Sequence, residues 1–142
     1  MRRDYFTVDF RCDTDGGVPT IAITYDGPSG DLRDRLTKTA AETLDSSEID
    51  IAFRRQADEE QGVLSLTDRM TGEFVFEVVT AGDDIETLVS AAQRHEGDGE
   101  YRVRLQDNDG QPLAYEKQTL LVYDHDGSLL RHRSLIPGGV EL

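Results

Sequence analysis

The stretch from Val63 to Asp107 constrains the fold more than any other part of the chain. Its letters run VLSLTD, RMTG, EFVFEVV, DDIETLVSAAQRHEG and EYRVRLQD. Apolar and polar residues alternate in the first and fifth pieces, and the third is a short run rich in Phe and Val, so that all three are predicted to be strands. In the fourth piece apolar residues recur at helical spacing behind an acidic capping position, which predicts a helix. The stretch therefore predicts strand, turn, strand, helix, strand, an order typical of an α+β protein.

The strand predicted within EFVFEVV has apolar residues on both faces. Phe74, Phe76 and Val78 share one face, while Val75 and Val79 share the other. Such a pattern is typical of a strand at the centre of a sheet that is covered on both sides. We therefore expect this strand to be central.

The flanking sequence predicts further elements of the same kind. Short loops favour antiparallel pairing, so we expect a mainly antiparallel sheet with two helices, in the order ββαβ-ββαβ-ββ. Ile21 to Phe53 and Phe74 to Leu105 share a strand, helix, strand layout, which raises the hypothesis of a duplicated ββαβ unit. The additional strands are expected at 5–12, 18–26, 48–55, 113–123 and 128–135, with a helix at 31–44 and a surface loop at 56–62.

The length of 142 residues predicts a single domain over 1–142, with a frayed tail at 136–142. The sequence contains no run of about 18 apolar residues, which is the length that would predict a membrane span. The amino terminus also carries no apolar run typical of a signal peptide. We therefore expect a cytoplasmic protein that does not enter a membrane. Cys12 is the only cysteine and alternates with Phe10 on one strand face, so we expect it to be a buried thiol.

The charge of the chain is strongly one-sided. A formal net charge of -14 arises from 18 aspartates and 11 glutamates against 13 arginines and only two lysines. In dilute buffer this charge opposes a compact state, whereas in molar salt a Debye length of about 3 Å screens it. The composition therefore favours a halophilic protein adapted to a salt-rich cytoplasm, and the alternative is a mesophilic acidic protein.

The pattern Asp-x-Asp-Gly occurs at 13–16, 107–110 and 124–127. Paired carboxylates beside a glycine resemble a calcium loop. In the middle copy, however, the first ligand position falls on Leu105, which has no side-chain oxygen. All three copies lie between alternating segments, so we interpret them as hairpin turns. No specific metal, cofactor, catalytic or metal-ligating residue is predicted.

Two other functional interpretations stay open. An enzyme would have to assemble its site from His125, His132, Glu116 and Arg102, because no familiar catalytic motif is present. Nucleic-acid binding is less favoured, because the net charge and molar salt remove the counterion-release contribution to affinity. It would require one continuous patch built from the arginine pairs Arg54–Arg55, Arg102–Arg104 and Arg131–Arg133.

The opening MRRDYFTVDF, the acidic turns and the ending LLVYDHDGSLLRHRSLIPGG resemble a family of short, uncharacterised acidic proteins from halophilic archaea. The resemblance extends over essentially the whole chain. It implies a cytoplasmic domain of unknown function, and it brings no family active site.

These observations favour a non-catalytic α+β module that binds a protein partner or forms a homodimer. The last predicted hairpin, which ends at Leu135, offers a strand edge for such pairing. If the chain has a site, we expect it on the arginine face of Glu100 to Gln106 or on that hairpin.

Overall fold

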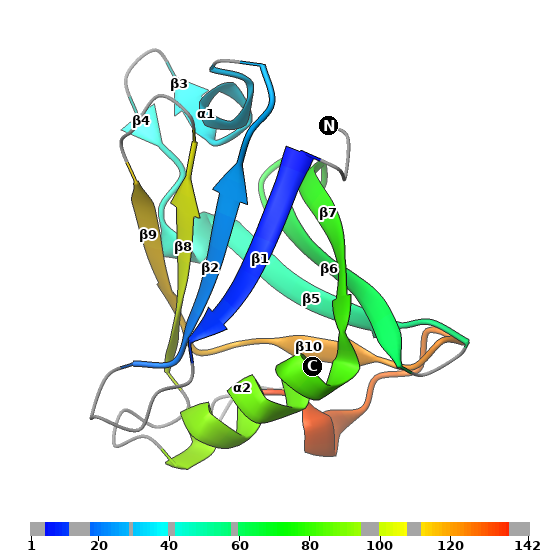
Figure 1. The fold of residues 1–142 in the computed structure, drawn as a ribbon. Helices are drawn as coiled ribbons and strands as arrows, with labels where there is room; N and C mark the ends of the chain where they lie inside the picture. The colour runs from blue at the N-terminus through cyan, green and yellow to red at the C-terminus, as the bar shows by residue number, and fades with distance from the viewer. Residues whose placement is uncertain are drawn as a thin grey trace.

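The computed structural model describes residues 5–11, 18–28, 30–39, 42–57, 60–94, 100–107 and 112–136. The fold is α+β, with two four-stranded sheets that pack on each other and two helices at opposite ends (Figure 1). The strands are β1 (Phe6–Arg11), β2 (Thr20–Tyr25), β3 (Thr37–Thr39), β4 (Glu42–Thr43), β5 (Ile49–Arg55), β6 (Gln61–Asp68), β7 (Phe74–Ala81), β8 (Tyr101–Gln106), β9 (Leu113–Lys117) and β10 (Leu121–Tyr123). The helices are α1 (Asp31–Arg35) and α2 (Gly82–Arg94), with 3-10 turns η2 (Ser46–Glu48) and η3 (Arg131–Arg133).

The two main sheets have mixed strand directions. The first sheet has the order β1-β2-β8-β9, in which β2 and β8 are parallel. The second sheet has the order β10-β5-β6-β7, in which β10 and β5 are parallel. The expected mainly antiparallel sheet is therefore too simple a description. Each sheet gains a parallel pair because it takes in a strand from a distant part of the chain.

The core lies between the inner faces of the two sheets. Phe6 of β1 stacks on Phe76 of β7 with ring centroids 4.9 Å apart, and it also contacts Tyr25 of β2 at 5.1 Å. Helix α2 closes one end of this core (Figure 1), and its predicted stripe of Ile85, Leu88, Val89 and Ala92 is buried. The helix predicted from this stripe is confirmed. No helix within the described residues is both long and apolar enough to cross a membrane.

The helix expected at 31–44 is much shorter in the structure. Helix α1 ends at Arg35, where the hydroxyl of Thr37 donates to the carbonyl of Arg33 at 2.6 Å, and the short strands β3 and β4 follow. Threonine is β-branched and favours extended backbone, which explains this change of structure. Leu36 and Leu44 are nevertheless buried, as the apolar stripe predicts.

The carboxyl-terminal region also differs from the expectation. The single strand expected at 113–123 is two strands, because β9 ends at Lys117 in the first sheet and β10 begins at Leu121 in the second. The strand expected at 128–135 is the 3-10 turn η3, flanked by bridges from Leu129 and Leu135 to the β10 region. The loop expected at 56–62 is shorter, because β6 begins at Gln61.

These segments cover the hairpin edge that was expected to pair with a partner. The backbone N–H of Val122 donates to the hydroxyl of Ser134 at 2.9 Å, and the N–H of Leu130 donates to the carbonyl of Val122 at 2.8 Å. A strand whose polar backbone groups are already bonded is a poor template for sheet extension.

The hypothesis of a duplicated ββαβ unit gains no support. The segment from Ile21 to Phe53 runs from the first sheet to the second through a five-residue helix. The segment from Phe74 to Leu105 runs from the second sheet to the first through a thirteen-residue helix. Cys12 and residues 137–142 of the expected tail lie outside the described residues.

Candidate functional site

The outer side of the second sheet forms a hollowed surface, which we call the open face. It is made by the outward side chains of Ala52, Arg54, Val63, Ser65, Thr67, Phe74, Glu77, Val79, Leu121 and Tyr123. Strand register arranges these side chains in rows across the four strands. The central row runs from Leu121 through Ala52 and Ser65 to Glu77. Its two middle members are small, so the sheet has a low floor between taller rows on either side.

A β-bulge places one aromatic ring on the open face. The register of β6 and β7 pairs Leu66 with Phe76 and Thr67 with Phe74, so that Val75 is an extra residue. The bulge turns Phe74 outward, where it is 52% exposed, while Val75 and Phe76 are both buried. Phe76 and Val78 share the inner face as expected, but the expectation that Phe74 shares it is wrong.

Strand β7 is also an edge strand rather than the expected central strand. Its outer side is not covered by another described element, and Val79 is 37% exposed there. The apolar residues on the outer side of this strand therefore include an exposed one, Val79, instead of being covered by another layer. The sequence pattern, apolar on both faces, predicts burial instead.

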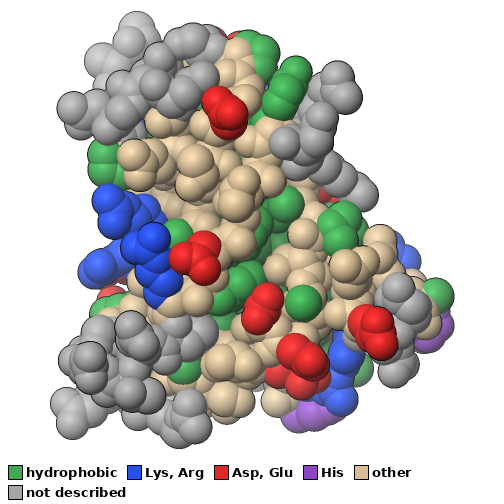
Figure 2. Space-filling model, in the orientation of Figure 1, with side chains coloured by type: hydrophobic (Ala, Val, Ile, Leu, Met, Phe, Trp, Pro, Cys, Tyr) green, Lys and Arg blue, Asp and Glu red, His purple; other side chains and the backbone are tan. Residues whose placement is uncertain are grey.

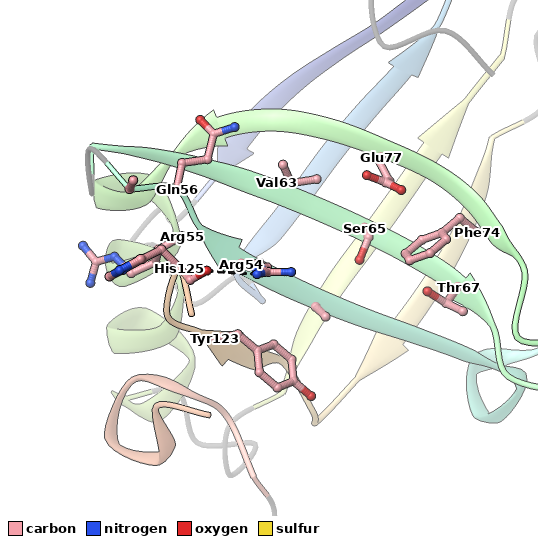
Figure 3. Close-up of a pocket in the computed structure, with 12 residues that line it drawn as sticks. Arg54, Arg55, Gln56, Val63, Ser65, Thr67, Phe74, Glu77, Tyr123 and His125 are labelled. Carbon is pink, nitrogen blue, oxygen red and sulfur yellow. Dashed lines mark hydrogen bonds between the residues drawn. The ribbon is translucent and has the colours of Figure 1, made fainter. Parts of the chain in front are cut away.

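The hollow on the open face has a volume of about 780 Å³. Figure 3 shows Tyr123 on one side of its floor and Phe74 on the other, with Ser65 on β6 and Glu77 on β7. Arg54 lies at one end, where its Nη2 donates to the carbonyl of His125 at 2.9 Å. The hollow thus combines two aromatic rings, a small-residue floor, hydroxyl groups and a held guanidinium.

The electrostatics of the hollow differ from those of the whole chain. Arg54 and Arg55 border it, although the Arg55 side chain is directed to the other side of β5 toward Glu86, and Glu77 is the only acidic side chain among the described lining residues. Across the chain, by contrast, acidic residues outnumber basic ones by 29 to 15. The Arg55 side chain is only 14% exposed and its Nη1 lies 3.7 Å from Glu86 Oε1, so Arg54 is the more accessible cation.

The residues proposed for an assembled enzyme site are divided between surfaces. Arg102 and Glu116 do meet, as a 3.0 Å ion pair on the outer side of the first sheet. His132 lies in η3, and His125 lies in the turn after β10, where its Nδ1 is 3.1 Å from Asp124 Oδ1. Only His125 lines the hollow, and its carboxylate partner is its own neighbour in the turn.

The arginine pairs lie on several surfaces. Arg102 pairs with Glu116, and Arg133 pairs with Glu86 at 3.1 Å. Arg54 faces the hollow, while Arg55 points to the opposite side of β5 toward Glu86. In Figure 2, basic side chains gather over the first sheet with acidic ones beside them. Among the described residues these pairs do not form one continuous patch.

The Asp-x-Asp-Gly segments can be compared with their expected turns. The copy at 124–127 is a turn, in which the N–H of Gly127 donates to the carbonyl of Asp124 and Gly127 has φ of 89°. In the middle copy, Asp107 is buried and forms a 2.9 Å ion pair with Arg33, while 108–110 lie outside the description. The copy at 13–16 also lies outside it. The described residues hold no group of three or more potential metal ligands.

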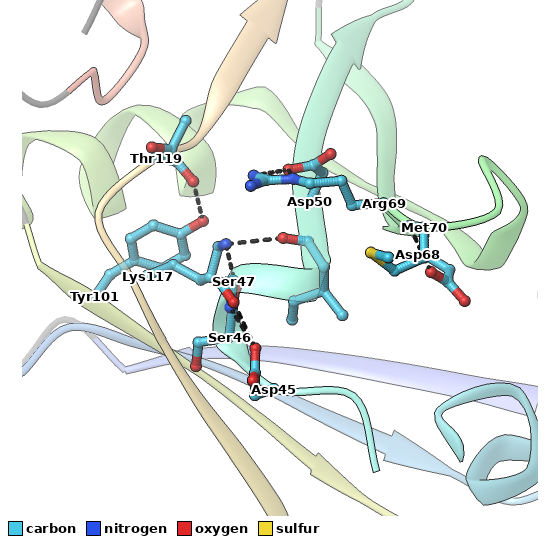
Figure 4. A network of polar contacts seen from close by, with 11 residues as sticks. Asp45, Ser46, Ser47, Asp50, Asp68, Arg69, Met70, Tyr101, Lys117 and Thr119 are labelled. Carbon is cyan, nitrogen blue, oxygen red and sulfur yellow. Dashed lines mark hydrogen bonds and ion pairs between the residues drawn. The ribbon is translucent and has the colours of Figure 1, made fainter. Parts of the chain in front are cut away.

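Sequence reasoning missed a buried cation, Lys117 of β9. Its Nζ donates to the carbonyls of Ser46 at 2.6 Å and Ile49 at 2.8 Å (Figure 4). Burial, with Arg69 nearby, lowers the pKa of Lys117. A lowered pKa can mark a reactive lysine, but two backbone carbonyls already hold this ammonium group. We therefore interpret Lys117 as a structural residue whose hydrogen bonds connect β9 to the start of β5.

The fold and the hollow together define a two-sheet α+β protein in which no other described element covers the outer face of the second sheet. The chain belongs to the Family of unknown function (DUF5793), whose family model matches residues 1–142. No match was found among curated proteins, and none among solved structures.

Proposed function

We propose that this protein is a non-catalytic interaction module that binds another protein chain on the open face. The acid-rich, lysine-poor composition supports a salt-rich cytoplasm as its working environment. A second copy of the chain is the simplest partner, and a different protein is the other.

One observation carries the proposal. The large apolar side chains exposed among the described residues are Met70, Phe74 and Val79, and two of these three lie on the open face. Exposed apolar side chains gathered beside a hollow are typical of interaction sites. Among the described residues that line the hollow, Glu77 is the only acidic side chain, and Asp50 on the same sheet face is paired with Arg69, so another acidic protein meets little repulsion there.

The proposal is tested with a face variant and a matched control. The face variant carries Phe74→Ser and Val79→Thr, and the control carries Met70→Ser, which removes an exposed apolar side chain outside the hollow. Light scattering in KCl of about 2–3 M, where charge repulsion is screened, measures self-association. Affinity purification from the native cells in the same salt, with mass spectrometry, identifies other partners.

We expect the wild type and the Met70 control to associate with themselves or with an identified protein, and the face variant to lose that association. A wild type that is monomeric and has no partner whose binding depends on Phe74 would contradict the proposal. Association that is unchanged in the face variant would place the interaction surface elsewhere.

A further inference from the structure

The size of the hollow indicates how much of a partner it can take. A standard protein interface involves about 20–30 residues on each side, whereas 12 residues line this hollow within the described part of the chain. Its volume of about 780 Å³ lies within the range of roughly 300–1,000 Å³ typical of sites for compact ligands. The hollow therefore suits a short segment of chain better than the broad face of a second domain.

The shape of the floor indicates where an apolar group would lie. Ala52 is paired with Ser65 on the neighbouring strand, and both are partly buried. The strand register places Tyr123 of β10 and Phe74 of β7 on either side of this pair, and Figure 3 shows both rings. A flat or branched apolar side chain placed on the pair would lie between the two rings and cover apolar surface that is now exposed.

The charge of the hollow indicates what would lie beside that group. The Arg54 guanidinium has five N–H donors, and its hydrogen bond to the His125 carbonyl holds it at the edge of the floor. A carboxylate that accepts from a guanidinium held in this way gains a charge-assisted hydrogen bond at a low ordering cost. A partner with an Asp or Glu side chain therefore complements this end.

The spacing of the two subsites fits an extended chain. Ala52 and Arg54 are two residues apart on β5 and both project to the open face. In an extended segment, side chains two positions apart also project to one side, at a similar separation of about 7 Å. An aromatic residue and an acidic residue at positions i and i+2 would reach the floor and the guanidinium together.

We infer that the open face binds a short extended segment of a partner protein with the pattern aromatic-x-acidic. The aromatic side chain lies on Ala52 and Ser65, between Tyr123 and Phe74, and the carboxylate lies on Arg54. This inference rests on the proposed function and specifies its partner. In molar salt long-range attraction is screened, so burial of the apolar group supplies affinity while direct contact with Arg54 supplies selectivity.

The test uses tryptophan as both ligand and reporter, because the chain itself contains no tryptophan. Three probes are titrated with the full chain in about 2 M KCl, the salt regime in which charge is screened. The first is a capped hexapeptide of otherwise glycine and serine with a tryptophan and, two positions later, a glutamate. The second has glutamine in place of that glutamate. The third is N-acetyl-tryptophan, a small molecule with the same two chemical groups.

We expect the acidic peptide to bind saturably with a blue shift of tryptophan emission, and the glutamine peptide to bind about tenfold more weakly, as expected for a charged hydrogen bond. With Arg54→Gln, both peptides should bind equally weakly. Phe74→Ser should weaken both peptides, and Met70→Ser should change neither. Near-ultraviolet circular dichroism verifies that each variant keeps its tertiary packing.

Three outcomes would overturn the inference. The first is that tryptophan emission shows no saturable change up to millimolar peptide. The second is that the acidic and glutamine peptides bind the wild type equally well. The third is that N-acetyl-tryptophan binds as tightly as the acidic peptide. The last would indicate a small-molecule site. If the peptides fail while association in light scattering still depends on Phe74, the broader interaction proposal stands and a second copy is the occupant. If both fail, the proposed function fails with the inference.

Discussion

Two buried tyrosines differ in whether their hydroxyl group is hydrogen-bonded, and this difference bears on the stability of the fold. The hydroxyl of Tyr101 donates to the carbonyl of Thr119 at 2.7 Å. The hydroxyl of Tyr115 is also buried, but it has no hydrogen-bond partner among the described residues. A buried polar group without a partner opposes folding, whereas a bonded one contributes net stability.

We therefore expect Tyr101→Phe to lower the free energy of unfolding by about 1 kcal/mol, because the Thr119 carbonyl loses its donor. Tyr115→Phe should be neutral or should raise it by up to about 1 kcal/mol. Urea unfolding at one fixed KCl concentration measures both. An equal loss in the two variants would indicate that the Tyr115 hydroxyl is bonded in solution.

The same residues predict how stability changes in alkali. Burial raises the pKa of Tyr115 from 10.0 to about 12 and raises that of Tyr101 as well. Above pH 10 the unfolded chain loses these protons first, so the unfolded state is favoured increasingly as pH rises toward 12. Below pH 10 these two groups contribute no pH dependence. Unfolding measured between pH 8 and 11 should show this loss, and Tyr115→Phe should make it shallower.

Lys117 is a residue whose loss affects two elements. Replacement of Lys117 by Met keeps an apolar stem of similar length but leaves the carbonyls of Ser46 and Ile49 without their donor. We expect the free energy of unfolding to fall by about 3 kcal/mol, from two buried carbonyls that lose their bonds. Gln118→Met, at the exposed neighbouring position, is the control. If the free energy of unfolding falls no more than in the control, the hydrogen bonds of Lys117 do not stabilise the connection between β9 and β5.

At the scale of elements, the β5–β6 hairpin depends on one glycine. A Cβ on Gly62 would lie 2.4 Å from the carbonyl oxygen of Arg54 and 2.4 Å from the ring of Phe53. Gly62→Ala therefore has to displace a strand or a core ring, and we expect a loss of about 2–3 kcal/mol.

Gly72 provides the comparison for that substitution. It has φ of 78° and open space around it, so Gly72→Ala meets only the backbone cost of about 1–2 kcal/mol. Thermal unfolding of both variants separates the two effects. If Gly62→Ala costs no more than Gly72→Ala, the close packing of β5 on β6 is looser than the distances indicate.

The elements also show which predictions sequence can support. Helix α2 could be predicted because its four buried residues are close in sequence and their spacing alone defines the face. The position of β7 could not, because apolar residues on both faces fit either a central strand or an edge strand with an exposed apolar side. The bulge at Val75 depends on the partner strand β6, so no local pattern in β7 reveals it.

At the scale of the molecule, long-range pairing limited what sequence could predict. The parallel pairing of Thr20–Thr24 with Arg102–Gln106 joins segments some eighty positions apart, and alternation within each strand is the same for any partner. The hollow follows from such pairing, because Ala52, Ser65 and Tyr123 become neighbours only when β10, β5 and β6 lie side by side. The strands that carry the hollow could therefore be predicted, but their order in the sheet could not.

The net charge leads to a prediction about the whole molecule. A charge of -14 spread over 142 residues produces repulsion that the folded state concentrates and the unfolded state relieves. Added KCl shortens the Debye length from about 10 Å at 0.1 M to about 3 Å at 1 M. We therefore expect the midpoint of thermal unfolding to rise by roughly ten degrees or more between these concentrations, which corresponds to about 3 kcal/mol for a chain of this size.

Sucrose is the control for this prediction. It stabilises proteins because it is excluded from their surface, and it does not screen charge. At matched osmolality, sucrose should raise the midpoint far less than KCl does. A midpoint that is already constant above about 0.2 M KCl, where the Debye length is still near 7–8 Å, would contradict adaptation to molar salt. In that case the aspartate-rich surface would serve solubility alone, and the affinity of the open face for an acidic segment would depend more strongly on attraction to Arg54.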